Sequence, residues 1–217
     1  MSSEQGRRSF VSVLASLAGL AAVGSAREAS AGQSALPTVA PPLDMAWLDQ
    51  MKGKHKQLYD FGSVEFSEDP RALRFCKNFL DTFRDVYKME FPDVNTAVGI
   101  SGSALPMNCS DRIWAKYKLG ERSMIVDPMT KQPAVRNIFL DTPDTGVKAM
   151  QARGTTFWQC NLALTNQAAQ IANAMQLPPA EVRADIIAGL NPGVKLMPSH
   201  VMALALAQER GFSYMKP

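Results

Sequence analysis

The sequence has little histidine and little cysteine, which limits the metal and redox chemistry that it can support. Of its 217 residues, only 2 are histidines and 3 are cysteines. A structural zinc site takes four such ligands at close spacing, and this chain does not offer them. It also has no C-x-x-C pair, which thioredoxin-like dithiol cycles and covalent haem attachment require. We therefore expect no metal site and no haem.

Motifs for nucleotide binding and for serine hydrolysis are missing as well. No G-x-G-x-x-G or G-x-x-x-x-G-K-[ST] stretch occurs, so the glycine-rich loops that hold phosphates are absent. Residues 99–103 resemble a nucleophile elbow but lack its final glycine, and Pro106 follows too closely for a helix to start there. We expect no cofactor, and neither a hydrolase nor a metalloenzyme.

The chain also has only a small excess of positive over negative charge. Lys and Arg number 23 against 20 Asp and Glu, a formal net charge of +3. This surplus is small and scattered, so it does not favour nucleic acid or an anionic membrane as a partner. The chain is 46% hydrophobic, which is enough to bury the core of a globular domain.

The first 31 residues are typical of a targeting segment. Arg7 and Arg8 precede an uncharged stretch, 9–26, that is rich in small and apolar residues but a poor bilayer span. A small-x-small cleavage pattern ends at Ala31, with a weaker one ending at Ala26. Together these features resemble a twin-arginine signal, with an ordinary secretory signal or an uncleaved anchor as alternatives. We expect export by the twin-arginine translocase to the periplasm, with no stable membrane span after cleavage.

Beyond the signal, residues 32–54 contain several prolines and are expected to form an extended tether. Residues 55–217 then form one domain. In an exported protein, the odd number of cysteines leaves at least one thiol unpaired. A bridge between Cys109 and Cys160 remains open at this point.

Strand and helix patterns alternate along the domain, which favours a mostly parallel sheet with helices on both faces. The expected strands cover 57–61, 96–100, 138–140, 155–159, 194–196 and 212–215. The expected helices start at Asp69-Pro70 and then cover 111–119, 144–151, about 161–175, 178–190 and 198–209. In the first helix, Leu73, Cys76, Leu80, Phe83 and Tyr87 recur every three or four residues on one face. We therefore expect Cys76 to be a buried core residue.

Two stretches follow expected strands, where functional groups gather in parallel sheets. One is the loop 101–108, and the other is Cys160, at the junction of a strand and a helix. A thiol at a helix N-terminus is stabilised as the thiolate by the helix dipole. The alternative is a buried and inert cysteine.

Three stretches carry a resemblance to a known family: 110–120 (SDRIWAKYKLG), 154–163 (GTTFWQCNLA) and 193–214. Together they resemble the DsrE/DsrF-like family of small sulfur-relay proteins, in its exported branch. The resemblance covers roughly residues 55–217. It implies a flavodoxin-like three-layer α/β/α sandwich that forms homo-oligomers. In the sulfur-relay members a cysteine at the end of a central strand carries sulfur as a persulfide, and Cys160 is the matching position.

The resemblance implies a sulfur carrier that acts between a sulfur donor and an acceptor protein. We expect the N–H groups of Asn161 and Leu162, with the Asn161 side chain, to hold the sulfur of Cys160. Ser101, Asn108 and Asp111 are the candidates for the neighbouring wall, although Asp111 also suits a helix cap. Ser101 stands where exported relatives often place a histidine. The alternative function is a non-catalytic module of the same fold that binds a small ligand or assembles with a partner.

Overall fold

The fold is built on a parallel sheet. The structure is a computed structural model that describes residues 45–62 and 73–217. Five strands lie in the order β4-β3-β2-β1-β5, and every neighbouring pair is parallel. The strands are β1 (His55–Phe61), β2 (Val94–Ile100), β3 (Thr156–Cys160), β4 (Lys195–Met197) and β5 (Ser213–Met215). All residues of β2 are buried, as expected for a central strand covered on both faces.

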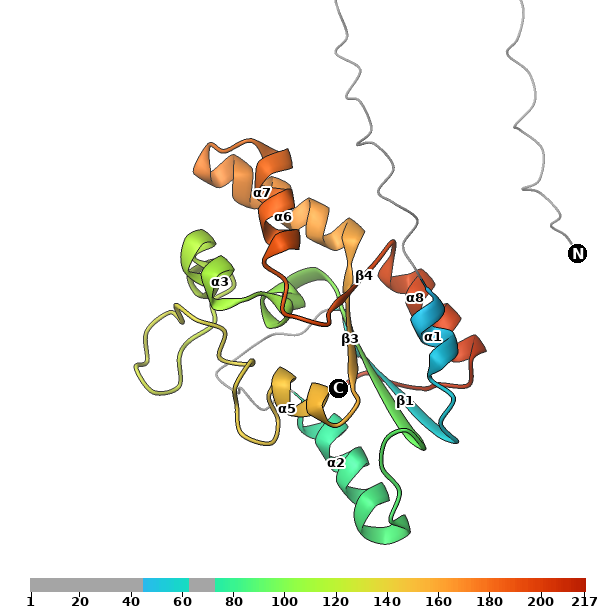
Figure 1. Cartoon of the computed structure of the whole chain (residues 1–217). Helices are drawn as coiled ribbons and strands as arrows, with labels where there is room; N and C mark the ends of the chain where they lie inside the picture. Colours follow the sequence, from blue (N-terminus) through green and yellow to red (C-terminus); the bar gives the residue numbers. More distant parts are fainter. Residues whose placement is uncertain (1–44, 63–72) are drawn as a thin grey trace, which may run out of the picture. The chain divides into compact units, whose positions relative to one another are not determined.

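Helices cover both faces of this sheet (Figure 1). The chain crosses the sheet in one direction from β1 to β4 and then returns to add β5 beside β1. Because parallel crossovers are right-handed, the first three connections lie on one face and the last one lies on the other. The α-helices are α1 (Ala46–Gln50), α2 (Arg74–Thr82), α3 (Asp111–Tyr117), α4 (Leu119–Arg122), α5 (Val147–Ala152), α6 (Asn161–Met175), α7 (Pro179–Ala188) and α8 (His200–Glu209), with a π-helix η1 (Phe83–Tyr87) and a 3-10 helix η2 (Gly102–Asn108).

This arrangement is the expected flavodoxin-like α/β/α sandwich, with one difference in strand order. In flavodoxin the outer neighbour of the first strand is the second strand of the chain. Here that position belongs to β5. The edge of the sheet beside β1 is therefore supplied by residues more than 150 positions away in sequence, as the 156-residue separation of Gln57 and Ser213 shows.

The two faces carry separate hydrophobic cores. The larger one joins β1, β2 and β3 to α2, α3, α5, α6 and α7, and we call this side the α6 face. The smaller one lies under α1 and α8, the α8 face, and consists of Trp47, Leu48, Met51, Leu58, Ala97, Trp158, Met197, Ala203, Ala207 and Phe212. Arg210, the C-cap of α8, forms an ion pair at 2.7 Å with Asp49 of α1.

The expected tether over 32–54 is wrong in its described part. Residues 46–50 form α1, and its Trp47 and Leu48 are buried at 8% and 1% exposure. These two side chains complete the smaller core, whose other helical members among the described residues come from α8. Burial of these two apolar side chains therefore accounts for the helix at 46–50.

The first helical stripe is buried as expected at its start but not at its end. Leu73, Cys76 and Leu80 are buried, whereas Tyr87 is 65% exposed. The last turn is the π-helix η1, and its wider turn rotates later side chains away from a 3.6-residue stripe. The expected helix start at Asp69-Pro70 lies outside the described residues.

Residues 138–140 were expected to form a strand, but they form a turn. Asn137 organises it: its side-chain oxygen accepts the Phe139 N–H at 2.9 Å, and its amide group donates to the carbonyls of Met107 and Cys109. The apolar side chain of Phe139 is still buried, at 1% exposure. An apolar run thus enters the core here without pairing in the sheet.

Two expected helix boundaries also differ. Asp144 does not begin a helix, because α5 starts at Val147 with Gly146 as its N-cap. The expected helix over 111–119 divides at Lys118, which adopts a left-handed conformation with φ of 51° and ends α3.

The export signal and cleavage sites lie outside the described residues. Within the described ranges, no helix has the length and apolarity to cross a membrane.

Candidate functional site

Cys160 lies at the point where connections from neighbouring strands leave on opposite faces. It ends β3 and pairs with Met197 of the adjacent β4. From β3 the chain enters α6 on one face, and from β4 it enters α8 on the other. Such a switch point at the carboxyl ends of parallel strands is where open α/β sheets bind their ligands. The fold therefore places the expected cysteine at the switch point of the sheet.

The sulfur of Cys160 accepts hydrogen bonds from the N-terminal turns of both helices. The Ala163 N–H of α6 donates to Sγ at 3.4 Å, and the His200 N–H of α8 donates at 3.3 Å. These N–H groups have no partners within their own helices, and each lies at the positive end of a helix dipole. Two N–H donors from different helices therefore converge on the sulfur of Cys160.

These donors differ from the expected ones. Cys160 is the N-cap of α6, and an N-cap side chain reaches the N–H two or three residues into the helix. Ala163 therefore donates in place of Asn161 and Leu162. The second donor, His200, comes from a segment 40 residues away, which the local pattern around Cys160 does not reveal.

The ring of His200 is fixed by hydrogen bonds at both nitrogens. The Trp158 indole lies 3.2 Å from Nδ1, and Asp60 Oδ1 lies 2.8 Å from Nε2. An indole N–H can only donate, so Nδ1 accepts and carries no proton. The ring proton is therefore on Nε2 and is donated to the Asp60 carboxylate.

Asp60 collects three donors at the end of β1. Besides His200, it accepts the Tyr214 hydroxyl at 2.7 Å and the Gly62 N–H at 2.8 Å. Partial burial acts to raise the pKa of this carboxyl, but hydrogen bonds from Tyr214, His200 and Gly62 outweigh it, and the pKa is lowered. The resulting stabilisation of the fold is present above the carboxyl's unfolded pKa and is lost as the pH falls through its lowered folded value.

Asp60, Trp158 and Cys160 share one face of the sheet because side chains alternate along strands. Gly99 of β2 lies between Asp60 of β1 and Trp158 of β3. Its lack of a side chain leaves room for the rings of Trp158 and His200. A Cβ at this position would lie 2.5 Å from the Trp158 indole and 2.8 Å from Cε1 of His200. The glycine is therefore required by close packing of the Trp158–His200 pair.

Two of the expected binding residues flank Cys160 without contacting its sulfur. Ser101 follows β2, one position beyond the register pair of Ile100 and Gln159, so it leaves the sheet beside Cys160. Asn161 follows Cys160 directly, but its side-chain oxygen accepts from Arg183 at 2.6 Å. That contact ties the start of α6 to α7.

The other two expected residues have structural contacts elsewhere. Asn108 is fully buried and donates to the Trp158 carbonyl at 3.1 Å and to Gln159 Oε1 at 3.2 Å. The Gln159 side chain lies on the opposite face from Cys160, since strand residues alternate. Asp111 accepts the Asn137 N–H at 2.8 Å and so fixes the loop before α5. The structure does not bring either residue to the sulfur.

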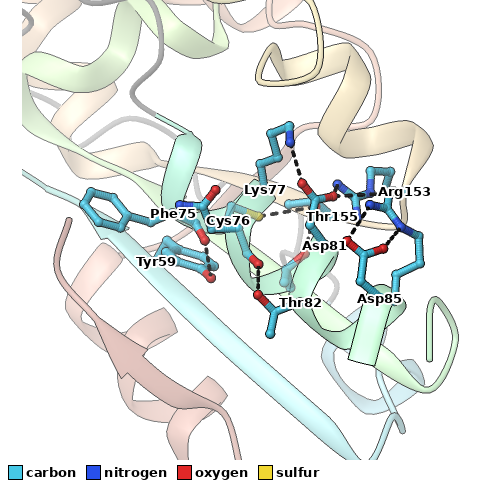
Figure 2. A network of polar contacts seen from close by, with 12 residues as sticks. Tyr59, Phe75, Cys76, Lys77, Asp81, Thr82, Asp85, Arg153 and Thr155 are labelled. Carbon is cyan, nitrogen blue, oxygen red and sulfur yellow. Dashed lines mark hydrogen bonds and ion pairs between the residues drawn. The ribbon is translucent and has the colours of Figure 1, made fainter. Parts of the chain in front are cut away.

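All three cysteines are free and buried, so the possible Cys109–Cys160 bridge is not formed. Cys76 lies between α2 and the sheet, with its Sγ 3.7 Å from the Thr155 hydroxyl (Figure 2). Burial raises the pKa of the Cys76 thiol to about 11 and also raises the pKa of the Cys109 thiol. Cys76 is therefore a core residue, as expected, and both thiols are held in their neutral form.

A network of charged side chains lies near Cys76 along α2 (Figure 2). Asp81 pairs with Lys77 on the same helix and with Arg153 at 2.8 Å. Arg153 is the C-cap of α5, so this pair connects α2 to the end of α5. The two sulfurs therefore differ in their contacts. The sulfur of Cys76 contacts a hydroxyl group inside a core, whereas the sulfur of Cys160 accepts N–H groups from the first turns of two helices.

Sequence reasoning missed Asp60, Trp158, His200 and Tyr214 as members of the site. Their contacts join residues 42, 140 and 154 positions apart. One signal was present: Asp60 is an acidic residue near the end of an apolar strand, where burial requires a partner. In the described ranges, no group of three or more His, Cys, Asp or Glu residues is arranged to hold a metal ion.

Comparison with known proteins leaves the activity open. No family model matches the chain, and no curated protein matches it. Among solved structures it is similar to a protein of unknown function, MTH1491 from Methanobacterium thermoautotrophicum. The identity is 14%, the match covers 75% of this chain and 99% of that chain, and the TM-score is 0.37. A similarity this distant assigns no function.

Proposed function

We propose that this protein handles sulfur through Cys160, as an exported sulfur carrier resembling the DsrE/DsrF-like family. The observation that carries the proposal is the position of the sulfur between the N-terminal turns of α6 and α8, at the switch point of the sheet. A persulfide is more acidic than a thiol and is an anion at neutral pH, so such donors suit it. The resemblance adds homo-oligomer formation and a sulfur acceptor protein to the proposal.

The chemistry is two successive displacements at sulfur. The Cys160 thiolate attacks a sulfur of an inorganic polysulfide, one S–S bond of the polysulfide breaks, and its electron pair leaves with the shortened polysulfide dianion. The product is the Cys160 persulfide anion. An acceptor thiolate then attacks its outer sulfur, and the new S–S bond forms as the Cys160 thiolate departs. Neither step needs a metal or a nucleotide.

The low exposure of the Cys160 sulfur limits the size of the sulfur donor that can reach it. Cys160 is only 4% exposed, while Leu162 and Val201, each next to one of the two N–H donors, are 59% and 73% exposed. A slim inorganic polysulfide fits this requirement better than a bulky organic one.

We expect Cys160→Ser to abolish persulfide formation. Purified protein is incubated with inorganic polysulfide, freed of excess reagent, and measured by intact mass and peptide mapping without reductant. The wild type should gain one sulfur atom on the peptide that contains Cys160. Cys76→Ala and Cys109→Ala serve as controls and should load as the wild type does, because these thiols are buried and neutral.

A second function is favoured by the same low exposure of Cys160, 4%. A fixed and inaccessible thiol suits a non-catalytic binding or assembly module of this fold. Loading that persists in Cys160→Ser, or no loading of the wild type, contradicts the sulfur carrier and leaves this module. Slow alkylation of Cys160 by a small reagent in the native protein would support the same conclusion.

Export is proposed on the sequence of the N-terminal segment. Arg7 and Arg8 precede the uncharged stretch 9–26, which is the arrangement of a twin-arginine signal. Changing both arginines to lysine should leave the precursor in the cytoplasm, because the translocase reads the arginine pair. Cell fractionation and immunoblotting measure this, with Arg27→Lys as a matched control. Equal periplasmic yield of the double variant would contradict the twin-arginine route.

A further inference from the structure

We infer that His200 is a positioning residue for Cys160, and that Trp158, Asp60 and Tyr214 hold it in the orientation that directs its backbone N–H at the sulfur. The inference rests on the proposed role of Cys160 as the reacting thiol. It concerns four residues from α8, β3, β1 and β5, which the chain brings together from distant segments.

The backbone of His200 begins α8. Its N-cap, Ser199, makes no side-chain hydrogen bond to the helix, so the first N–H groups of α8 need other acceptors. For His200 that acceptor is the sulfur of Cys160, at 3.3 Å. The position of this N–H therefore depends on what holds residue 200 in place.

The imidazole ring keeps residue 200 in place. Its two nitrogens are occupied by the Trp158 indole and the Asp60 carboxylate, and the residue is only 7% exposed. Rotating the ring would break both hydrogen bonds inside a packed site. The ring also cannot serve as a base for Cys160 in this state, since neither nitrogen faces the sulfur with a free lone pair. His200 therefore acts through its backbone.

The chain of contacts continues to the molecular surface. Asp60 Oδ2 accepts the hydroxyl of Tyr214, which lies on the edge strand β5 and is 45% exposed. Displacing this hydroxyl leaves Asp60 with one donor fewer and loosens its hold on His200. Contacts at the β5 edge are thereby linked to the reactivity of a sulfur that is itself buried.

The test uses a reaction that does not depend on sulfur transfer. The rate of alkylation of Cys160 by iodoacetamide is measured across pH by peptide mapping, in the wild type, Asp60→Asn and Tyr214→Phe. Asp60→Asn should slow the reaction about fivefold near neutral pH, the effect of losing one hydrogen bond to the sulfur, and should move the profile to higher pH. Tyr214→Phe, at an exposed position, should slow it about twofold by the same reasoning. Tyr87→Phe, at a residue 65% exposed on η1, is the matched control and should react as the wild type does.

A nitrogen-15 NMR spectrum of the imidazoles reports the ring state independently. The chain has 2 histidines, so His55→Gln isolates the signal of His200. We expect the Nε2-protonated tautomer in the wild type and mixed tautomers in Asp60→Asn. A wild-type ring protonated on Nδ1 would overturn the inference.

The kinetic outcomes also separate the inference from the proposed function. If Asp60→Asn alters the ring tautomer but leaves both the alkylation rate and its pH profile unchanged, His200 does not position the sulfur. If the wild type and variants alkylate as expected but take up no persulfide, the positioning role stands and the sulfur carrier fails. Tyr214→Phe keeps the test valid should Asp60→Asn fail to fold.

Discussion

Cys76→Asp should destabilise the domain by about 4 kcal/mol or more, because it buries a carboxyl in the core while the nearby cations Lys77 and Arg153 are already paired with Asp81. Cys76 is 1% exposed, and its sulfur lies 3.7 Å from the Thr155 hydroxyl. Burial raises the pKa of an introduced carboxyl and keeps it neutral, yet the added polar atoms still lose their water. Urea unfolding followed by far-ultraviolet circular dichroism measures the change.

Two variants of the same helix separate charge burial from other effects. Asn78→Asp introduces the same carboxyl at an exposed position two residues away, and we expect it to change stability by less than about 0.5 kcal/mol. Cys76→Ala removes only the buried sulfur and should cost about 1–2 kcal/mol. A Cys76→Asp protein as stable as Asn78→Asp would show that this site is open to solvent.

Trp158→Ala should cost about 3–5 kcal/mol, the range for deleting a large aromatic side chain from a core. Trp158 is fully buried in the smaller core, its ring centroid lies 6.1 Å from that of Trp47, and its N–H holds His200. The core under α1 and α8 has few members, so little else can fill the cavity. Thermal unfolding by calorimetry should show a large drop in Tm.

Trp158→Phe distinguishes packing from hydrogen bonding. A phenyl ring keeps most of the buried area but removes the indole N–H, so Nδ1 of His200 loses its donor. We expect a smaller loss of stability than in Trp158→Ala, together with mixed tautomers at His200. Equal stability of the alanine variant and the wild type would contradict the assigned core.

The parts of the fold that depend on neighbours in sequence are predictable. The β-prone run before Cys160, the helix after it and the stripe that buries Cys76 each arise from a local pattern of side chains. The junction of β3 and α6 therefore follows from the sequence, and with it the candidate cysteine. The turn at 138–140 does not, because the Asn137 side chain satisfies the backbone there in place of a neighbouring strand.

The rest of the site depends on contacts between distant segments. Which strand lies beside β1 is decided by packing over the whole chain, and it brings Tyr214 to Asp60. The donor from α8 reaches Cys160 only because β4 lies next to β3. The four expected residues follow Cys160 directly or follow the neighbouring strand β2, whereas His200, Asp60 and Tyr214 come from α8, β1 and β5.

The pairing of β5 with β1 has a consequence for the order in which the protein folds. Contacts such as α6 with α7 close short loops and can form early, but Asp60 must wait for partners 140 and 154 residues away. Long loops close slowly, and their contacts are made late in folding. During synthesis and refolding, the His200 N–H can reach Cys160 across a short loop, but the Asp60–Tyr214 contact that holds the His200 ring is complete only when β5 joins the sheet. The orientation of the His200 ring would then report the last stage of folding.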